Sequence, residues 1–394
     1  LAAVEKAWQR FGSLPWHELF QPTIEVVRAG FPLPAACHYY LGYSGELIFG
    51  RSRDGHTALH DENGRLYGRG SRIRVPHLAD SLAAIADRGA AVFYDGELAE
   101  AIAAHVREGG GALTREDLAG YDAIERPALV ADIDDWHIAT NPPPAVGGAV
   151  LTAMLLACGD LHAGDWDSTS LGKLIRVQRA CLDFRRDRLD IAEDVDAAAT
   201  ELIRAAKQGR FLSQWSSSST VHTSAVDDSG VGCAVTASSG YGSGEMPDGT
   251  GLWLNNGLGE IELNRRDVNS REPGERLPSN MAPTVARSSD ATMAIGSPGA
   301  DRITTAIHPV LVNTLQFGMP LDDAIAHPRI HVDTTGEADQ LRAEPGLEIP
   351  ALDLPLQAFP DINMYFGGVS VATFDRHKGF EVAADARREG GVFL

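Results

Sequence analysis

Thr220 has the surroundings expected of a catalytic nucleophile. It follows a run of serines that ends at Ser219, and it opens a stretch rich in β-branched residues that predicts a strand. If the Ser219–Thr220 peptide bond is cut, Thr220 gains a free α-amine beside its own hydroxyl, so that one residue supplies both nucleophile and base. A threonine at the head of a buried strand is also an ordinary strand former, and for a single threonine this second reading is the commoner one.

A second stretch has the composition of an oxyanion site. Residues 296–300 read Gly-Ser-Pro-Gly-Ala. Small residues let a substrate carbonyl approach the backbone closely, so the N–H groups near Gly299 and Ala300 are suited to stabilise a developing oxyanion. The same five residues also suit an ordinary turn.

These two stretches, in this order, resemble the small subunit of γ-glutamyltranspeptidases, a family of N-terminal-nucleophile hydrolases. From Thr220 the chain reads Thr-x-His-x-Ser-x-x-Asp-x-x-Gly, followed by Ala-Val-Thr and a turn rich in glycine and serine. Further stretches in the family's order extend the resemblance over almost the whole chain: residues 11–16, 113–118, 141–144, 254–260, 273–284, 296–303 and 366–369.

The resemblance implies roles for individual residues. Thr220 attacks the substrate amide, the Ser238 hydroxyl supports it, and the backbone of Gly299 and Ala300 holds the oxyanion. Glu260 stands where the family places an acidic residue that pairs with the α-ammonium group of the substrate. The substrate-binding residues implied by the resemblance are Ser239, Asn256, Glu260, Ser279 and Asn280.

Three of these positions depart from the residues usual in the family. Ala300 replaces a glycine, which we expect to be a mild change if its φ angle is negative. Asn280 replaces the second of two hydroxyl residues that hold the α-carboxylate of the substrate, and its amide can still donate a hydrogen bond. Ser239 replaces a residue that is commonly asparagine.

The activity implied by the resemblance is hydrolysis or transfer of γ-glutamyl amides through a threonine acyl-enzyme. The partners are a small γ-glutamyl substrate such as glutathione and an acceptor, either water or an amine, and no cofactor or metal is required. Self-cleavage before Thr220 divides one precursor into a large-subunit-like segment, residues 1–219, and a small-subunit-like segment, residues 220–394. The two pieces are expected to form a heterodimer.

Two alternatives stay open. The same threonine chemistry suits an acylase that acts on another amide, such as the side chain of a β-lactam. The other alternative is an uncleaved, inactive homologue whose pocket only binds a ligand.

The first alternative stays open because of an arginine. The large subunit of the family normally begins with a segment whose arginine clamps the substrate carboxylate, and residues 1–394 do not supply that segment. We therefore expect either an N-terminal fragment or a lost clamp, with Arg276 and Arg302 as the candidates to replace it.

The elements that position these residues follow from sequence periodicity. Helical patterns occupy residues 1–37 with breaks at prolines, 78–89, 96–108, 149–159, 171–189, 304–317 and 321–326, and hairpin patterns occupy residues 127–140 and the stretch after Thr220. Residues 42–70 have the composition of a loop, and residues 207–219 that of a linker or a segment held taut around a cut. Strands flanked by helices predict an α+β fold, which the resemblance sharpens to an αββα four-layer sandwich.

Composition argues against several other classes of protein. The formal net charge of −20, from 54 acidic and 34 basic residues, argues against an extended nucleic-acid surface. The longest apolar run, residues 145–158, is too short to span a bilayer. Residues 240–244 lack the last glycine of a dinucleotide fingerprint. Pro328 separates His327 from His331, and the four cysteines form no C-x-x-C, so we expect no metal site and small, buried cysteines.

Overall fold

The computed structural model describes the chain except for residues 160, 162–165, 209–219, 261–262, 265–270 and 335–337. Its contacts divide the described residues into two compact units: unit 1 comprises residues 1–125 and 242–255, and unit 2 comprises residues 126–241 and 256–394. These units are defined by contacts, whereas the boundary expected at residue 219 is a cut peptide bond. That boundary therefore stays a prediction. Ser219 and nearly all of the expected linker, residues 207–219, lie outside the described residues.

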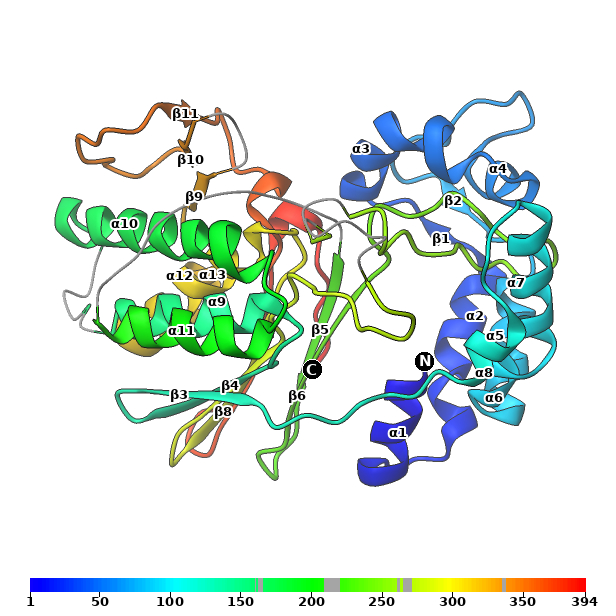
Figure 1. The fold of residues 1–394 in the computed structure, drawn as a ribbon, viewed down its shortest axis with the longest axis horizontal. Coiled ribbons are helices and arrows are strands. Elements are labelled where there is room, and N and C mark those ends of the chain that lie inside the picture. Colours follow the sequence, from blue (N-terminus) through cyan, green and yellow to red (C-terminus); the bar gives the residue numbers. More distant parts are fainter. Residues whose placement is uncertain (160, 162–165, 209–219, 261–262, 265–270, 335–337) are drawn as a thin grey trace. The chain divides into compact units, whose positions relative to one another are not determined.

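Unit 1 is mainly helical (Figure 1). Its helices are α1 (Ala2–Phe11), α2 (Gln21–Ala29), α3 (Ala35–Ser44), α4 (Arg53–Leu59), α5 (Leu78–Arg88), α6 (Ala91–Tyr94), α7 (Glu97–Glu108) and α8 (Arg115–Ala119), and the strands β1 (Phe31–Pro32) and β2 (Arg72–Ile73) pair antiparallel. Helices α5 and α7 confirm the helices predicted at 78–89 and 96–108. The loop expected at 42–70 is wrong in part, because it contains α4, whose seven residues are too few to show a helical period.

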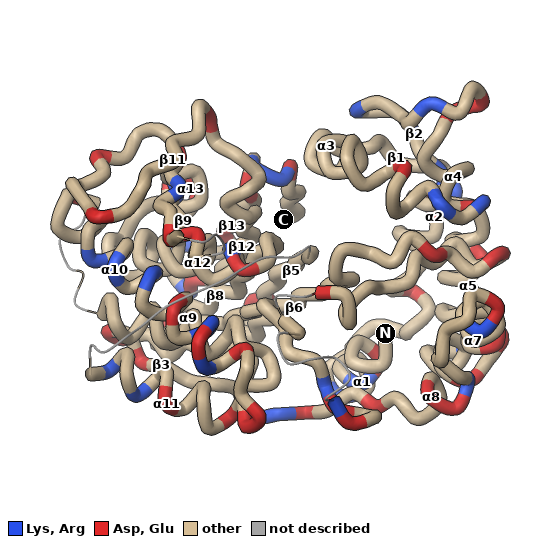
Figure 2. The backbone as a smooth tube through the Cα atoms, turned by 45° about the horizontal axis from the view of Figure 1, so that its top comes forward, with Lys and Arg blue, Asp and Glu red and all other residues tan. Residues whose placement is uncertain are grey.

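Residues 242–255 return to unit 1 from the later part of the chain. Trp253 Nε1 donates to the carbonyl of Phe49 at 3.2 Å, and His105 Nε2 lies 3.0 Å from a carboxylate oxygen of Glu245. Acidic and basic positions are interspersed along the helices of this unit (Figure 2), which suits solvated helix faces.

Unit 2 is built on a six-stranded antiparallel sheet with the order β13-β12-β8-β7-β4-β3. Its strands are β3 (Leu129–Ile133), β4 (Trp136–Thr140), β7 (Thr284–Arg287), β8 (Ala291–Gly296), β12 (Ser370–Asp375) and β13 (Gly379–Ala384). The hairpin predicted at 127–140 is confirmed as β3 and β4. A smaller sheet has the order β11 (Leu356–Ala358), β10 (Gln340–Ala343) and β9 (Ile330–Asp333).

Helices cover one face of the large sheet. Three of them contact its strands: α9 (Val146–Ala157), α12 (Arg302–Leu311) and α13 (Leu321–Ala326). The helices α10 (Ser168–Phe184) and α11 (Val195–Gln208) pack on α9. Met293 and Ile295 of β8 point toward this layer, since both share a buried apolar cluster with Ile303 and Ile307 of α12. The sequence did not predict α11, although it buries Ala199, Leu202 and Ala206 along one stripe.

A two-stranded hairpin lies on the other face of the sheet (Figure 1). It consists of β5 (Thr220–Val226) and β6 (Gly232–Ser238), which confirms the hairpin predicted after Thr220. Gly232 contacts Thr292 of β8, and Thr292 Oγ1 donates to the carbonyl of Gly230 in the hairpin turn at 3.1 Å. Helices, sheet and hairpin therefore form successive layers of unit 2.

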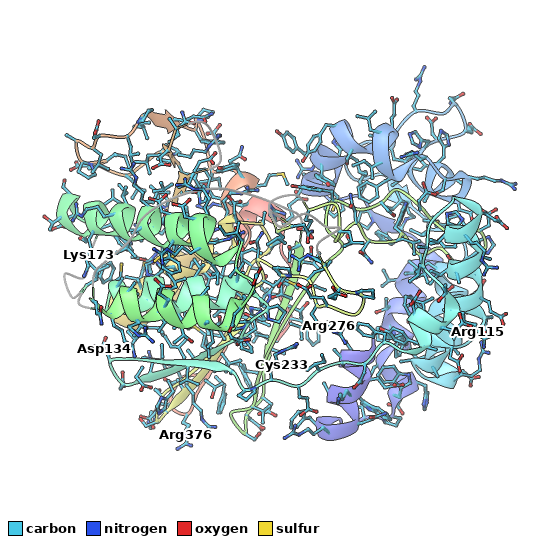
Figure 3. The ribbon with its side chains drawn as sticks, viewed as in Figure 1. Arg115, Asp134, Lys173, Cys233, Arg276 and Arg376 are labelled. Carbon is cyan, nitrogen blue, oxygen red and sulfur yellow. The ribbon has the colours of Figure 1, made fainter. Side chains whose placement is uncertain are left out.

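Two smaller expectations can be compared with this structure. No helix among the described residues is long and apolar enough to cross a membrane. Cys158 and Cys181 are buried as expected, whereas Cys37 and Cys233 are exposed. Cys233 (Figure 3) lies on the outer face of β6, where the alternation of a strand turns every second side chain away from the sheet.

Candidate active site

The head of the hairpin places Thr220 next to Ser238. The two residues are directly paired across the ladder, at its end, where facing Cβ atoms are about 5 Å apart. Along β5 the half-buried residues Thr220, His222 and Ser224 alternate with exposed ones, so Thr220 lies on the face that packs on the large sheet. The structure thus brings the predicted nucleophile together with the serine predicted to support it.

The turn after Ser238 brings in Glu260. The Ser238 hydroxyl accepts a hydrogen bond from Gly240 N at 3.1 Å, and the carbonyl of Ser239 accepts one from Asn256 N at 2.8 Å. Gly240 has a φ of +62°, and a Cβ at this position would lie 2.6 Å from the carbonyl oxygen of Asn256 and 3.1 Å from Oε1 of Glu260. Only glycine fits there, and the Glu260 carboxylate therefore lies against the turn that begins at Ser238.

Glu260 is held in place by a local network. Its side chain is only 5 % exposed. Asn264 Nδ2 donates to the carbonyl oxygens of Gly257 at 3.0 Å, Leu258 at 3.2 Å and Glu260 at 3.1 Å. One amide group thus fixes the backbone that carries the carboxylate.

Ser279 and Asn280 lie at the N-terminus of α9. The carbonyl of Ser279 accepts hydrogen bonds from Val146 N at 2.9 Å and Gly147 N at 3.3 Å. Gly147 must be glycine, because a Cβ there would lie 2.1 Å from the carbonyl oxygen of Asn280. Among the described residues, no hydrogen bond links this pair to Thr220.

The side-chain amide of Asn280 is buried without a partner. Asn280 is 4 % exposed, and neither Nδ2 nor Oδ1 has a hydrogen-bond partner among the described residues. A buried polar group in this state costs free energy, about 1 to 3 kcal/mol, unless something pairs with it. Asn280 is therefore suited to hold a polar ligand group.

The stretch from Gly296 to Ala300 is buried and follows directly from β8. The hydroxyl of Ser297 accepts a hydrogen bond from Gly368 N at 3.0 Å and donates to the carbonyl of Pro298 at 2.6 Å. A Cβ at Gly299 would lie 3.0 Å from the Cα of Gly367. Residues 367 and 368 therefore brace this stretch from one side.

Ala300 has a left-handed backbone. Its φ is +69°, so the condition under which we expected a mild change from glycine is not met. An L-residue in this region costs about 1 to 2 kcal/mol relative to the ordinary helical region. Directly after it, α12 begins at Arg302, and the positive end of this helix dipole favours negative charge nearby.

Arg302 is already engaged. Its Nη1 lies 2.6 Å from Oδ1 of Asp301, its Nε donates to the carbonyl of Tyr365 at 2.9 Å, and its guanidinium stacks 4.6 Å from the centre of the Tyr365 ring. Arg302 is thus a poor replacement for the carboxylate clamp. Arg276 (Figure 3) is half-buried and also has an interaction partner.

The histidines at 327 and 331 have structural contacts. His331 Nδ1 lies 2.9 Å from Thr305 Oγ1, and its Nε2 lies 3.4 Å from Asp301 Oδ2. His327 Nδ1 lies 3.0 Å from the carbonyl of Pro328. In the described part of the chain, no three His, Cys, Asp or Glu side chains gather in a way that could hold a metal ion.

Burial and pairing act against each other at Asp301. Burial alone raises the pKa of this carboxyl, but Arg302 and then His331 hold the pKa well below its usual range. Asp301 is therefore a permanent anion at the start of α12.

Sequence reasoning missed one half-buried polar group near Thr220. His222 lies two residues along β5, with Nδ1 2.7 Å from Thr236 Oγ1 and Nε2 2.8 Å from Ser224 Oγ. Burial lowers the pKa of His222 to about 4, so the imidazole is neutral at pH 7. The Thr-x-His spacing was the available signal, since alternation places both side chains on one face of a strand.

Comparison with known proteins places this geometry in a family. A sequence model described as Gamma-glutamyltranspeptidase matches residues 1–394. The glutathione hydrolase proenzyme of Escherichia coli (strain K12) is 27 % identical over 390 residues, covering 90 % of this chain and 67 % of that protein. The glutathione hydrolase proenzyme of Pseudomonas aeruginosa is 29 % identical over 361 residues, covering 83 % and 63 % respectively. The chain thus spans about two thirds of the length of these relatives.

A solved structure shares the fold. The crystal structure of cephalosporin acylase from Bacillus halodurans matches with a TM-score of 0.77 and 22 % identity, over 99 % of this chain and 76 % of that one. This likeness confirms the α+β fold of the N-terminal-nucleophile hydrolase type expected from the sequence.

Proposed function

The chain belongs to the gamma-glutamyltranspeptidase family, and from this premise we propose that it is a γ-glutamyl amide hydrolase and transferase with Thr220 as its nucleophile. The observation that carries the proposal is the place of Thr220. It heads β5 opposite Ser238, on the face that packs against β8, and β8 leads directly into Gly299 and Ala300.

Activation is a cut before Thr220. The Thr220 hydroxyl attacks the carbonyl carbon of Ser219, the bond to the Thr220 nitrogen breaks, and that nitrogen takes the proton, which leaves an ester on Oγ. Water then hydrolyses the ester. The products are residues 1–219 and residues 220–394, which stay together as two subunits, and the second begins with a free amine.

Catalysis reuses the same hydroxyl. The α-amine of Thr220 takes the hydroxyl proton as Oγ attacks the γ-glutamyl carbonyl, and the backbone N–H groups of Gly299 and Ala300 stabilise the oxyanion. The amine then gives the proton to the leaving group, and an acyl-enzyme remains. Water or an acceptor amine releases the acyl group, and the Ser238 hydroxyl supports Thr220 throughout.

Substrate recognition is assigned to the polar groups around this centre. Glu260 pairs with the α-ammonium group, and its carboxylate lies against the turn that follows Ser238. Ser279 and Asn280 hold the α-carboxylate, and the unpaired, buried amide of Asn280 supports this role. Ser239 and Asn256 complete the substrate-binding set. The relatives' names point to glutathione as the substrate class.

The proposal is tested by the products of self-cleavage. N-terminal sequencing of the smaller band on a denaturing gel is expected to read Thr-Val-His-Thr. The Thr220→Ala variant is expected to stay one uncut chain without amidase activity. A fragment that begins elsewhere, or an active Thr220→Ala protein, contradicts the nucleophile. A wild-type chain that never cuts supports the inactive homologue.

A second candidate is an acylase for a different amide, and the engagement of Arg302 with Asp301 and Tyr365 favours it, since the carboxylate clamp is then unassigned. Glu260→Ala separates the two. Removing a charge-assisted contact costs about 1.5 to 3 kcal/mol, so kcat/KM for a γ-glutamyl anilide is expected to fall by roughly one to two decades. A glutaryl anilide, which lacks the α-amine, is expected to be unaffected. Equal losses on both substrates contradict amine recognition by Glu260.

A further inference from the structure

The imidazole of His222 is the centre of a hydrogen-bonded chain between the hairpin and the large sheet. The Ser224 hydroxyl, which lies 2.8 Å from Nε2, donates to the carbonyl of Ser370 in β12 at 3.1 Å. Thr236 of β6 lies on the other ring nitrogen. The chain therefore joins β6, β5 and β12 through one side chain.

The direction of this chain fixes the tautomer of the ring. Ser224 has one hydroxyl proton, and the Ser370 carbonyl can only accept, so the Ser224 oxygen must accept from Nε2–H. In a neutral ring Nδ1 then has to accept from the Thr236 hydroxyl. Both nitrogens of His222 are thus occupied, and the ring has no lone pair left to act as a base for Thr220.

The hydrogen-bonded chain through His222 meets the large sheet at Gly296, where the stretch from Gly296 to Ala300 begins. Ser370 pairs directly with Gly296, the last residue of β8. The ring itself lies against Gly296, since a Cβ there would be 2.2 Å from Cε1 and 2.4 Å from Nδ1 of His222. Such an approach requires glycine at 296 and leaves the imidazole little freedom to shift.

Thr220 and the oxyanion donors lie at short, fixed spacings from this contact. Thr220 is two residues before His222 on the same face of β5, about 6.6 Å along a strand. Gly299 is three residues beyond Gly296. The His222–Gly296 contact therefore ties the strand that carries the proposed nucleophile to the stretch that carries the proposed oxyanion donors.

We propose that His222 is a positioning residue: as a neutral Nε2–H imidazole it ties β5 to the Ser370–Gly296 pair and so sets the separation between the Thr220 hydroxyl and the Gly299 and Ala300 amides. This role rests on the proposed function of Thr220. The low pKa of His222 agrees with it, because a protonated ring could not accept from Thr236.

The proposal is tested with two side chains of nearly equal length. His222→Gln keeps a donor at the level of Nε2 that can reach Ser224, whereas His222→Met has a similar volume and no donor. Thr223→Val, on the exposed outer face of the same strand, is the control. The substrate is a γ-glutamyl anilide, and self-cleavage of the precursor is followed in parallel.

A misplacement of about 1 Å costs about 100-fold in rate, so kcat and the rate of self-cleavage are expected to fall about 100-fold in His222→Met. The KM is expected to stay within about twofold, because the substrate-binding residues are untouched. The loss in His222→Gln is expected to be about tenfold or less, and Thr223→Val is expected to match the wild type. Equal losses in the Gln and Met variants, or a changed KM with unchanged kcat, contradict the positioning role.

The tautomer is read independently of activity. Imidazole ¹⁵N spectra of the Thr220→Ala protein at pH 7 are expected to show His222 protonated at Nε2 and bare at Nδ1. A ring protonated at Nδ1, or at both nitrogens, overturns the proposal. A wild-type protein that neither cuts itself nor hydrolyses the anilide contradicts the proposed function alone, and the spectra then still decide whether the tie exists.

Discussion

The stretch from Gly296 to Ala300 is held from two sides by different chemistry. On the hairpin side, the support is a chain of neutral hydrogen bonds through His222. On the other side, a buried cluster of ions holds the neighbouring backbone. We call this the ion cluster, and its members are Arg329, Glu344, Asp385 and Arg387.

The ion cluster reaches the stretch from Gly296 to Ala300 through residues 366–369. Arg329 Nη1 donates to the carbonyl of Phe366 at 3.1 Å, and Asp385 Oδ2 accepts from Val369 N at 3.1 Å. Between those two residues, Gly367 contacts Gly299, and Gly368 N donates to Ser297. Charged side chains thus fix one turn of backbone, and that turn braces the stretch from Gly296 to Ala300.

The difference between the two sides lies in what each loses when a partner is removed. All four members of the ion cluster are less than 10 % exposed, so each charge has given up its water and depends on its partners. Burial lowers the pKa of Arg329 although Asp385 opposes it; at Arg387 burial acts in the same direction, yet Glu344 raises the pKa above its ordinary value. The hydrogen-bonded chain through His222 is neutral and carries no such penalty. It holds the ring in place because each of its groups has a fixed role as donor or acceptor.

The largest effect is expected from breaking the ion cluster. Arg387→Met leaves Glu344 with an uncompensated buried charge, and the free energy of unfolding is expected to fall by about 3 to 5 kcal/mol. Urea unfolding measures it. Arg188→Met is the matched control, since Arg188 pairs with Glu201 at 2.8 Å on an exposed surface and is expected to contribute about 1 kcal/mol or less. Similar losses in both variants contradict the importance of burial.

Acid is expected to weaken the hairpin side. The pKa of His222 is about 4 in the folded protein and 6.5 in the unfolded chain, so between these values the unfolded state binds more protons. The contribution of His222 to the free energy of unfolding therefore falls as the pH drops from about 6.5 to about 4. Asp301, whose pKa is held low after folding, loses its contribution only below its ordinary value of 3.8.

The His222→Gln variant isolates the contribution of His222 to the pH dependence of stability. Asp183, whose pKa is raised to about 7 by burial and by Asp339, acts with the opposite sign over the whole of this range. Urea unfolding of wild type and His222→Gln at several pH values between 7 and 4 cancels that common contribution. The variant is expected to lose less stability on acidification; parallel curves would show that the imidazole does not titrate in this window.

The smallest effect is expected at Ala300, between the two sides. Ala300→Gly removes the strain of a φ of +69° and keeps the N–H group, so stability is expected to rise by about 0.5 kcal/mol, with kcat within about twofold. The same change in α12, Ala306→Gly, is expected to lower stability by about 1 kcal/mol or more. Thermal unfolding compares the two, and a loss in both variants contradicts the left-handed backbone at Ala300.

Local signals were sufficient to predict the hairpin side. The β-branched residues after Thr220 and the Asp-Ser-Gly turn specify a hairpin within about twenty residues. The pairing of Thr220 with Ser238 follows from that turn. The burial of His222 could not be predicted from the sequence, because it depends on Gly296 and Ser370, which lie far along the chain.

The ion cluster could not be predicted in the same way. Arg329, Glu344, Asp385 and Arg387 are single charged residues spread over about sixty positions, and most such residues are solvated. The φ of +69° at Ala300 was equally out of reach, because no local sequence pattern predicts a left-handed backbone at an alanine. Local sequence patterns therefore predicted the position of Thr220 at the head of a strand. The residues that surround it are determined by long-range packing.

Thr220 and Ser238 are the terminal pair of a two-stranded ladder, and terminal pairs open more readily than the rest of a strand. If the preceding bond is cut as proposed, the peptide chain no longer restrains Thr220 on its upstream side, and fraying of β5 withdraws the proposed nucleophile. The fraction of time for which the enzyme is competent is then a local opening equilibrium, with His222 as the first firm point from the chain end. Amide hydrogen exchange along β5 would measure that equilibrium residue by residue, with protection rising from Val221 toward Thr223.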